Sequence, residues 1–328
     1  MSLPIIKYCP GTLKEGHETY SNLALKRMFH GKKVSPVLPY DSPSSGTVAN
    51  SLFLENTKRM SISGVQEKFS VLLKKNKLRL IDEGEQGTYI LKPIPHVGIR
   101  ADQMPANEHL TMQISRQVFG IETAENALVF FQNGAPAYIT KRFDVKDDGG
   151  KLAQEDFASL AGRTPQTHGV DYKYLGNYLD VFELLKKHTP AYQIEAIKLF
   201  KVIVFNYLFS NGDAHLKNFS LIETPAGDFK LSPAYDLLNT RIHIEDKDFA
   251  LEEGLLPPNI TVGKVKEQLC KLGELAGIID KQIDLVMKSA TSHQEKITAL
   301  VRASYLNERT KKNYLQSYQT RLKKLQRE

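Results

Sequence analysis

The chain has few cysteines and no long apolar segment. Only two of its 328 residues are cysteine, Cys9 and Cys270, and they lack the close spacing of metal-ligand pairs. A reducing cytoplasm is therefore the expected compartment. The N-terminus MSLPIIKYCPG has neither the basic start nor the apolar stretch of a signal peptide. The most apolar run, IKLFKVIVFNYLF, is about 13 residues long and too short to span a bilayer. These absences predict a soluble, cytoplasmic protein with no membrane partner.

Repeats and low-complexity tracts are also absent, and the composition is ordinary. Hydrophobic residues make up 41% of the chain and charged residues 25%, which is typical of a globular protein with a packed core. The net charge of +7 is spread along the chain, apart from the basic run RTKKNYLQSYQTRLKKLQRE near the C-terminus. This charge suits an acidic ligand or partner without requiring nucleic acid.

The order of the predicted elements divides the chain in two. After an irregular start, the segments RMSISGVQEKFSVLL, KLRLI and TYILKP predict a sheet, ANEHLTMQISRQVFG predicts a helix, and Asn133-Gly134 lies between two further strands as a hairpin turn. After KDDGG at 146–150, which reads as a linker, the pattern is mostly helical. The predicted fold class is α+β, a bilobal protein-kinase-like fold. Its small, β-rich N-terminal lobe with one helix covers 1–145, and its larger, mostly helical C-terminal lobe covers 146–328.

The segment SNGDAHLKNFSLI, at 210–222, places charged and amide groups where an apolar helix ends and a strand begins. Such groups cost desolvation free energy unless something binds there. Asp213 and Asn218 have the spacing of the kinase Asp that orients an acceptor hydroxyl and the Asn that binds magnesium. A hairpin through TPAGD would return Asp236 to Asn218, so that a carboxylate and an amide oxygen could share hard metal ions. We therefore interpret 211–218 as a catalytic loop.

Two further side chains of this loop have both functional and simpler interpretations. Lys217 suits the charge of a transferred phosphate, although a solvated lysine is equally ordinary. His215 could order the loop or could be a core histidine with satisfied hydrogen bonds. An isolated Asp or Asn before a strand is usually a turn former. The coincidence of these groups with a returning Asp236 favours function, although Asp-Leu-Leu stands where kinases have Asp-Phe-Gly.

The N-terminal half supplies complementary groups. Lys92, in a predicted strand, has the position of the kinase lysine that holds the nucleotide phosphates, and Glu108, in the first turn of the predicted helix, could pair with it. Single residues of these types are more often surface features. SISGVQEKFS lies where kinases have a phosphate-covering loop, but it contains only one glycine, Gly64. Its backbone N–H groups could still bind phosphate. KRFD at 141–144 would be the hinge that contacts adenine.

Seven motifs in order, SISGVQEKFSVLL, YILKP, NEH, KRFD, QEDF, NGDAHLKN and SPAYDLL, resemble those of HipA-family serine/threonine kinases, the toxins of bacterial toxin–antitoxin systems. The resemblance covers roughly 61–240. QEDF is also explained by the capped start of a helix. Because the first motif arrives at Ser61, we expect no room for the family's additional N-terminal subdomain. This shortness and the Ser-Ile-Ser pattern are similar to the HipT kinases of HipB–HipS–HipT systems, in which that subdomain is a separate small protein.

The resemblance implies ATP and Mg²⁺ as cofactors and assigns site residues. The catalytic group would be Asp213, His215 and Lys217, the metal ligands Asn218 and Asp236. Glu108 would pair with Lys92. Ser61 and Ser63 would be autophosphorylated. The ATP-binding residues would be Ser63, Gly64, Val65, Gln66, Glu67, Lys68, Lys92, Lys141, Arg142, Phe143, His215, Asn218, Tyr235 and Asp236.

The resemblance also implies partners. The protein substrate would be an aminoacyl-tRNA synthetase, in HipT-like members tryptophanyl-tRNA synthetase, whose phosphorylation stops translation. A HipS-like small protein and a HipB-like DNA-binding antitoxin would join the kinase in a complex on operator DNA, where this chain would not read the sequence itself. The irregular first 57 residues or so leave sheet surface or strand edges for the HipS-like protein to cover.

Three alternatives remain open. A two-metal phosphoesterase also uses Asp-x-His with a distant Asp and Asn, but it needs several more histidines on strand ends than this sequence offers. A small-molecule kinase would use the same groups on a different acceptor. A catalytically silent module of a DNA complex could use the basic C-terminal run, but the catalytic positions all hold chemically competent residues.

Overall fold

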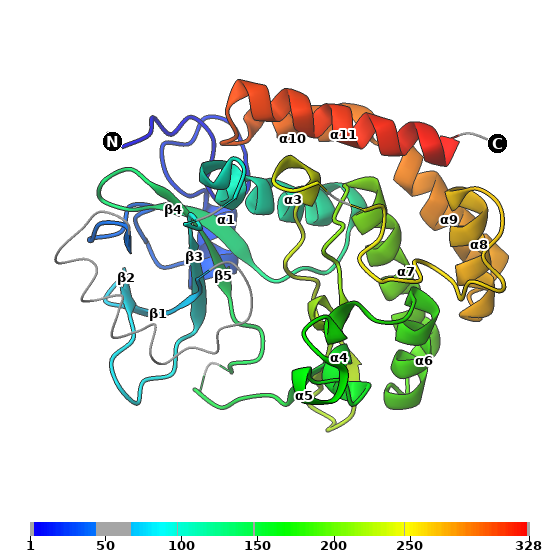
Figure 1. The fold of residues 1–328 in the computed structure, drawn as a ribbon. Helices are drawn as coiled ribbons and strands as arrows, with labels where there is room; N and C mark the ends of the chain where they lie inside the picture. The colour runs from blue at the N-terminus through cyan, green and yellow to red at the C-terminus, as the bar shows by residue number, and fades with distance from the viewer. Residues whose placement is uncertain (1–2, 44–66, 97, 147, 246, 327–328) are drawn as a thin grey trace.

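The protein was analysed as a computed structural model, which describes residues 3–43, 67–96, 98–146, 148–245 and 247–326. It combines a β-sheet with a helical portion, and helix α3 (Met104–Phe119) lies between them (Figure 1). The five strands of this sheet pair antiparallel in the order β2-β1-β3-β5-β4. Their bounds are β1 Phe69–Lys74, β2 Lys77–Leu80, β3 Tyr89–Pro93, β4 Asn126–Phe130 and β5 Pro136–Lys141.

Both hairpins of the sheet have local causes in the sequence. Lys75 and Asn76 join β1 to β2 with φ angles of 47° and 62°, the left-handed conformation that two-residue hairpin turns require. Between β4 and β5, Gly134 has a φ of 85°, which glycine adopts without steric cost. The predicted hairpin around Asn133-Gly134 is therefore present. The strand expected around residues 59–62 lies outside the described residues.

Alternating side chains of the sheet enter two different hydrophobic clusters. Leu128, Phe130 and Tyr138 pack with α3 and the helical portion, whereas Ala127, Val129, Ala137 and Ile139 pack with the N-terminal segment. This period of two is the ordinary geometry of a strand buried on both faces. The sheet therefore contributes to two cores.

The N-terminal segment corrects the expectation of an irregular start and of a single helix before residue 145. Helix α1 (Asn22–Phe29) begins at Ser21, whose side chain accepts a hydrogen bond from Ala24 N–H. Its eight residues are too few for a clear periodic pattern. Met28 and Phe29 of α1 are buried with Cys9 and Leu38 against the sheet. The apolar sheet face is thus covered by residues of this chain.

The helical portion is arranged around α7 (Tyr192–Leu208), which is apolar on nearly all sides and largely buried, as expected of a central helix. A second sheet, β6-β7-β8, pairs Gln154–Asp156, Ser220–Glu223 and Phe229–Leu231. Asp156 caps α4, as the QEDF motif predicts. The helices are α4 Phe157–Leu160, α5 Pro165–His168, α6 Tyr178–His188, α7 Tyr192–Leu208, α8 Val265–Leu275, α9 Asp280–Thr291, α10 Gln294–Ala303 and α11 Glu308–Gln326.

The segment between the two halves is a closed turn. Val145 pairs with Lys151 in an antiparallel bridge, and Lys146 N–H donates to Gly150 O at 2.8 Å. The linker expected at 146–150 is therefore a tight connection where it is described. Within the described ranges, no helix has the length and apolar character needed to cross a membrane.

Candidate active site

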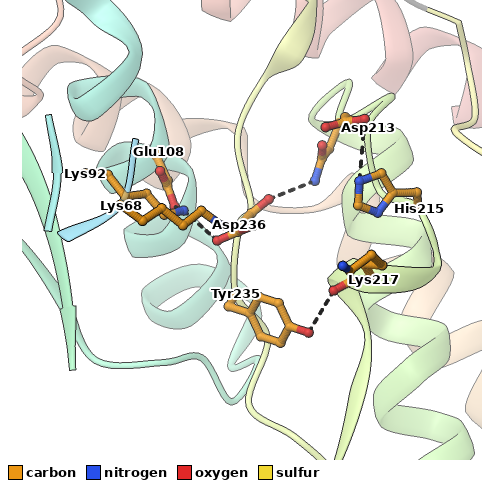
Figure 2. A network of polar contacts seen from close by, with 9 residues as sticks. Lys68, Lys92, Glu108, Asp213, His215, Lys217, Tyr235 and Asp236 are labelled. Carbon is orange, nitrogen blue, oxygen red and sulfur yellow. Dashed lines mark hydrogen bonds and ion pairs between the residues drawn. The ribbon is translucent and has the colours of Figure 1, made fainter. Parts of the chain in front are cut away.

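Lys92 joins two carboxylates that come from distant parts of the chain. It lies in β3, and its Nζ is 2.6 Å from Glu108 Oε1 on α3 and 2.6 Å from Asp236 Oδ1 beyond β8. The Lys92 and Glu108 side chains are only 4% and 2% exposed. Figure 2 shows Asp236 between the two lysines, Lys68 and Lys92, on one side and the loop with Asp213, His215 and Lys217 on the other. The contact expected between Lys92 and Glu108 is present, and Asp236 shares the same ammonium group.

The charges in this cluster depend on one another. Burial opposes the ionised form of Asp236, but Lys68 and Lys92 together hold its pKa below the ordinary value. Burial likewise opposes the charge of Lys92, and Asp236 and Glu108 more than offset it, so the pKa of Lys92 is raised. For Glu108 burial prevails and raises the pKa. Asp236 is therefore the carboxylate best suited to bind a cation at neutral pH.

Asp236 has a strained backbone. Its φ is 55°, a left-handed conformation that costs a side-chain-bearing residue about 1–3 kcal/mol. Lys68 Nζ lies 3.4 Å from Asp236 Oδ2, and Asn211 Nδ2 lies 3.4 Å from the Asp236 carbonyl oxygen. These contacts and the bond to Lys92 hold the strained residue in place. Such strain is common where a side chain must point into a ligand site.

The loop at 211–218 follows α7, and the side chain of its Asp213 is 45% exposed. Tyr174 donates its hydroxyl hydrogen to Asp213 Oδ1 at 2.7 Å, and His215 Nε2 is 3.9 Å from the same oxygen. Burial lowers the pKa of His215 to about 4, although Asp213 acts in the opposite direction. His215 is therefore neutral near pH 7. The Tyr174 ring meets it edge to face at 5.1 Å between centroids, so His215 packs on the tyrosine that donates to Asp213.

Asn218 ends a short 3₁₀ helix, Leu216–Asn218, just before β7. Its Oδ1 is buried and has no hydrogen-bond partner among the residues that the structure describes. A buried amide oxygen without a partner is unfavourable unless a ligand or ion completes it. With Asp236 it would give a metal ion two oxygen ligands, the donor type that Mg²⁺ prefers. In the described part of the chain, no three His, Cys, Asp or Glu side chains are grouped for a metal ion.

Lys217 contacts Tyr235 through its backbone and Tyr172 through its side chain. Its carbonyl oxygen accepts a hydrogen bond from Tyr235 Oη at 3.0 Å, which links the loop at 211–218 to the residue before Asp236. Its Nζ lies 6.0 Å from the centre of the Tyr172 ring. The structure therefore places this ammonium group beside Tyr172 at the edge of the loop.

The predicted hinge and phosphate loop are described only in part. Phe143 packs on Tyr235 at 5.9 Å between ring centroids, whereas Lys141 contacts His30 and Arg142 pairs with Asp144. At the end of the phosphate loop, Glu67 lies 3.4 Å from His96. Ser61, Ser63, Gly64, Val65 and Gln66 lie outside the described residues. Phe143 and Tyr235 are thus the aromatic pair next to Asp236.

The sequence did not predict two features of the site. Tyr174, the partner of Asp213, lies in a segment whose pattern indicated only a helical lobe. Asn107, beside Glu108, forms two hydrogen bonds with the Asn239 backbone: its Nδ2 donates to Asn239 O at 2.9 Å, and its Oδ1 accepts from Asn239 N at 3.1 Å. The NEH motif contained Asn107, but only the folded chain shows what it contacts.

Comparison with known proteins gives consistent results. The family model of the HipA-like C-terminal domain matches residues 60–306. A Haemophilus influenzae protein named "Putative kinase" is 30% identical over 226 residues, 67% of this chain and 63% of that protein. "Putative kinase Y4dM" of Sinorhizobium fredii is 36% identical over 210 residues, 60% of this chain and 48% of that protein. The chain therefore spans less than two thirds of the length of these relatives.

Two solved structures share the fold. One is a chain of the Shewanella oneidensis MR-1 toxin–antitoxin complex of HipA, HipB and operator DNA, with a TM-score of 0.61 and 20% identity over 81% of this chain and 64% of that one. The other is the Helicobacter pylori proinflammatory kinase CtkA, with a TM-score of 0.51 and 15% identity over 77% of this chain and 92% of that one. These similarities confirm a mixed α/β fold with a sheet and a helical portion.

Proposed function

Because this chain belongs to the family of proteins with a HipA-like C-terminal domain, we propose that it is a serine/threonine protein kinase that uses ATP and Mg²⁺. The relatives named as kinases support the reaction class. The observation that carries the proposal is the position of Lys92, 2.6 Å from both Glu108 and Asp236. In protein kinases a strand lysine pairs with a helix glutamate, and a nearby Asp holds the metal. On this proposal, 1–145 and 146–328 are the two lobes of a bilobal kinase.

The side chains of the site have distinct roles in this proposal. Bound Mg²⁺ and ATP would supply the phosphoryl group and the positive charge that offsets the charge on it. Asn218 and Asp236 would hold the metal, and Lys92 the nucleotide phosphates. Asp213 receives the proton of the acceptor hydroxyl and orients that hydroxyl, while Tyr174 fixes the carboxylate through the 2.7 Å bond to Oδ1. His215, neutral near pH 7, orders the loop without adding a cation.

The proposal also includes a binding site for adenine and a site of autophosphorylation. Phe143 and Tyr235, packed together beside Asp236, would flank adenine at the hinge. We place autophosphorylation on Ser61 and Ser63 of the Ser-Ile-Ser loop. A phosphate there would add about −1.5 to −2 charge near the nucleotide phosphates and would weaken ATP binding.

The biological role proposed is that of a toxin, with an aminoacyl-tRNA synthetase as substrate. The structural neighbour from a HipA–HipB–DNA complex supports a HipB-like DNA-binding partner for this chain. The HipT subtype, the tryptophanyl-tRNA synthetase substrate and a HipS-like partner stay predictions from the sequence resemblance. Since residues of this chain cover the apolar face of the sheet, a HipS-like protein would have to dock elsewhere. Co-expression with neighbouring genes, followed by co-purification and growth measurements, tests these partners.

Incubation with labelled ATP and magnesium, followed by mass spectrometry, tests the proposed function. The wild-type chain should incorporate phosphate into itself or into a synthetase. Asp213→Asn and Asp236→Asn should each lower the rate at least about 100-fold while circular dichroism and thermal unfolding show a folded protein. Asp228→Asn, in the exposed turn between β7 and β8, is the matched control and should act like wild type. Folded Asp213→Asn with normal activity would refute the assignment, and phosphate transfer only to small molecules would favour the small-molecule kinase.

A further inference from the structure

One face of the C-terminal helix α11 contacts α3, the residue before the loop at 211–218, and Asp248. The helix lies beyond the residues that the family model matches, which end at 306, and runs along the upper edge of the molecule in Figure 1. Tyr314, Ser317, Arg321 and Lys324 follow one another at intervals of three or four residues, so they lie on one face of the helix. Tyr314 contacts Thr111 of α3, Ser317 and Arg321 contact Ser210 just before the loop at 211–218, and Lys324 contacts Asp248.

Ser210 is the residue through which α11 reaches the catalytic loop. It stands directly before the loop with a φ of 53°, a conformation that a residue with a side chain adopts only when its surroundings hold it. Its Oγ accepts hydrogen bonds from Ser317 Oγ at 2.9 Å and from Arg321 Nε at 3.2 Å. Both partners belong to α11, so this helix supplies the contacts that fix the Ser210 side chain.

The Ser210 carbonyl oxygen extends the connection into the segment after Asp236. It accepts hydrogen bonds from Thr240 N at 3.1 Å and from Thr240 Oγ1 at 2.9 Å. Thr240 Oγ1 in turn accepts a bond from Gly212 N at 2.9 Å, and Gly212 directly precedes Asp213. Two short hydrogen-bonded steps therefore lead from Ser210 to the catalytic Asp.

Arg321 is fully buried, and one carboxylate offsets its charge, while Nη1 and Nη2 form no hydrogen bond of normal geometry with the residues that the structure describes. Its guanidinium group pairs with Asp248, which also lies 3.2 Å from Lys324 Nζ, and stacks over the Tyr207 ring at 4.8 Å. The Arg321 side chain is 0% exposed, whereas Asp248 is 43% exposed. A buried guanidinium with a planar set of donors holds several partners at fixed angles, which a lysine cannot do. Arg321 thus contacts Tyr207 at the C-terminal end of α7, Ser210 and Asp248.

The same face of α11 also reaches the helix that carries Glu108. Tyr314 Oη and Thr111 Oγ1 are 2.8 Å apart, and Thr111 Oγ1 donates to Asn107 O at 2.9 Å. Tyr318, on the adjacent side of α11, stacks on Phe209, the residue before Ser210, at 5.2 Å between centroids. The helix therefore contacts α3 and the end of α7 at the same time.

We propose that α11 is a brace for the active site, in which Ser317 and Arg321 are positioning residues that hold Ser210 and, through Thr240 and Gly212, set the orientation of Asp213. This inference rests on the proposed kinase function. Neither residue touches the substrate in this account. Their loss moves the catalytic Asp while the nucleotide groups around Lys92 stay in place.

The main test compares kcat and KM for ATP in Arg321→Met, Arg321→Lys and Ser317→Ala, measured well below each variant's unfolding temperature. Because small misplacements of a reacting group reduce rates by up to about 100-fold, kcat should fall about 10- to 100-fold for both Arg321 variants and less for Ser317→Ala. KM for ATP should stay within about 2-fold. Lys323→Ala, an exposed change on another face of α11, should leave both constants unchanged. Unchanged kcat in a folded Arg321→Met protein, or a loss of kcat and of ATP affinity together, would overturn the brace.

Substitutions of Ser210 separate positioning from simple stability. Glycine adopts a positive φ freely, so Ser210→Gly should retain more activity than Ser210→Ala. In the Ser210→Gly background, Ser317→Ala should have no further effect on kcat, because the hydroxyl that it contacts is gone. Additive effects of the two changes would contradict the proposal.

Hydrogen–deuterium exchange gives a readout that does not depend on activity. Amides of 211–218 should exchange faster in Arg321→Met than in wild type, while amides of β3 and β5 keep their rates. If the wild-type chain phosphorylates nothing, the kinase proposal fails, and the exchange result still decides whether α11 braces the loop. If wild type is active and exchange in 211–218 is unchanged in Arg321→Met, only the brace is wrong.

Discussion

Lys92 is the residue on which the electrostatics of the candidate site depend. Its ammonium group contacts two carboxylates at 2.6 Å, one of them on a side chain that is 2% exposed. Ion pairs of this kind are costly to desolvate, and they stabilise a fold only while each charge keeps its partner. The arrangement is therefore sensitive to the loss of a single charge.

Lys92→Met should destabilise the protein even without nucleotide. Removing one member of a buried ion pair costs about 3–5 kcal/mol, and Glu108 would be left without its cation. Urea unfolding should show a decrease in the free energy of unfolding of this size, and the Lys92→Met/Glu108→Gln double variant should regain part of it. Lys230→Met, which removes an exposed pair with Glu122, should cost less than about 1 kcal/mol. Equal losses at both positions would contradict the role of burial.

Two buried histidines make the stability depend on pH. Burial lowers the pKa of His109 to about 3 and that of His215 to about 4, from an ordinary value of 6.5. Between the lowered pKa of each histidine and its ordinary value of 6.5, the unfolded chain binds a proton that the folded chain does not. The free energy of unfolding therefore falls as the pH decreases below about 6.5. Each histidine contributes a slope of up to about 1.4 kcal/mol per pH unit. Urea unfolding at pH 7, 6 and 5 measures the sum.

A double variant isolates these two side chains from the carboxylates. His109→Gln/His215→Gln should show a shallower dependence on pH between 6.5 and 5 than the wild type. The same slope in both proteins would mean that other groups cause it.

At the level of elements, three consecutive residues of α3 lie on different sides of the helix and make different contacts. Asn107 binds the Asn239 backbone, Glu108 pairs with Lys92, and His109 is buried on a third side. Three successive helical positions point about 100° apart. All can be buried because α3 lies between the sheet and the helical portion. A shift of α3 would therefore disturb Lys92 and the segment after Asp236 together.

Asn107→Leu should uncouple α3 from that segment. The Asn239 N–H and C=O groups would lose their partners in a buried setting, which costs about 2–3 kcal/mol. Thermal and urea unfolding measure this loss, and kcat should decrease with it. Gln117 is exposed near the C-terminal end of the same helix, and within the described ranges its side chain hydrogen-bonds to the Thr12 carbonyl oxygen and Gln113. Gln117→Ala should stay within about 0.5 kcal/mol of wild type. An Asn107→Leu protein as stable as wild type would show that the two bonds contribute nothing.

At the level of the whole molecule, the larger hydrophobic cluster includes residues from both halves of the sequence. Leu110, Leu128 and Phe130 pack in the same cluster as Phe205 and Leu272. The proposed lobes are thus joined by a shared core as well as by the polar contacts of Lys92 and Asp236. A ligand that contacts both proposed lobes should therefore raise the unfolding temperature of the whole chain in a single transition.

A non-hydrolysable ATP analogue with magnesium should raise the unfolding temperature. At a ligand concentration 100 times the Kd, binding adds about 2.7 kcal/mol to the stability of the folded state. Calorimetry should show that the analogue raises the unfolding temperature less when EDTA removes the metal. For Lys92→Met, the rise in unfolding temperature on adding the analogue and magnesium to that variant should also be smaller than for the wild type. An equal shift with and without metal would argue against Asn218 and Asp236 as metal ligands.

The sequence alone determined the features that depend on neighbouring residues. The Asn133-Gly134 hairpin, the buried α7, the β7–β8 hairpin and the spacing of Asp213 and Asn218 follow from turn chemistry, apolar periodicity and short motifs. These motifs also identified the family, because they occur in a fixed order. The helix α1 was missed, since a short capped helix in a Pro- and Ser-rich segment has too few turns to show a period.

The tertiary structure decided which distant segments meet. Lys92 and Asp236 are 144 residues apart, and Thr111 and Tyr314 are 203 apart. No local pattern encodes such contacts, because they depend on how whole elements pack against one another. The cover of the sheet by the N-terminal segment and the contacts of α11 with Ser210 belong to this class. The sequence therefore specified the chemical groups of the site and the pairing of Lys92 with Glu108, and packing specified their other partners.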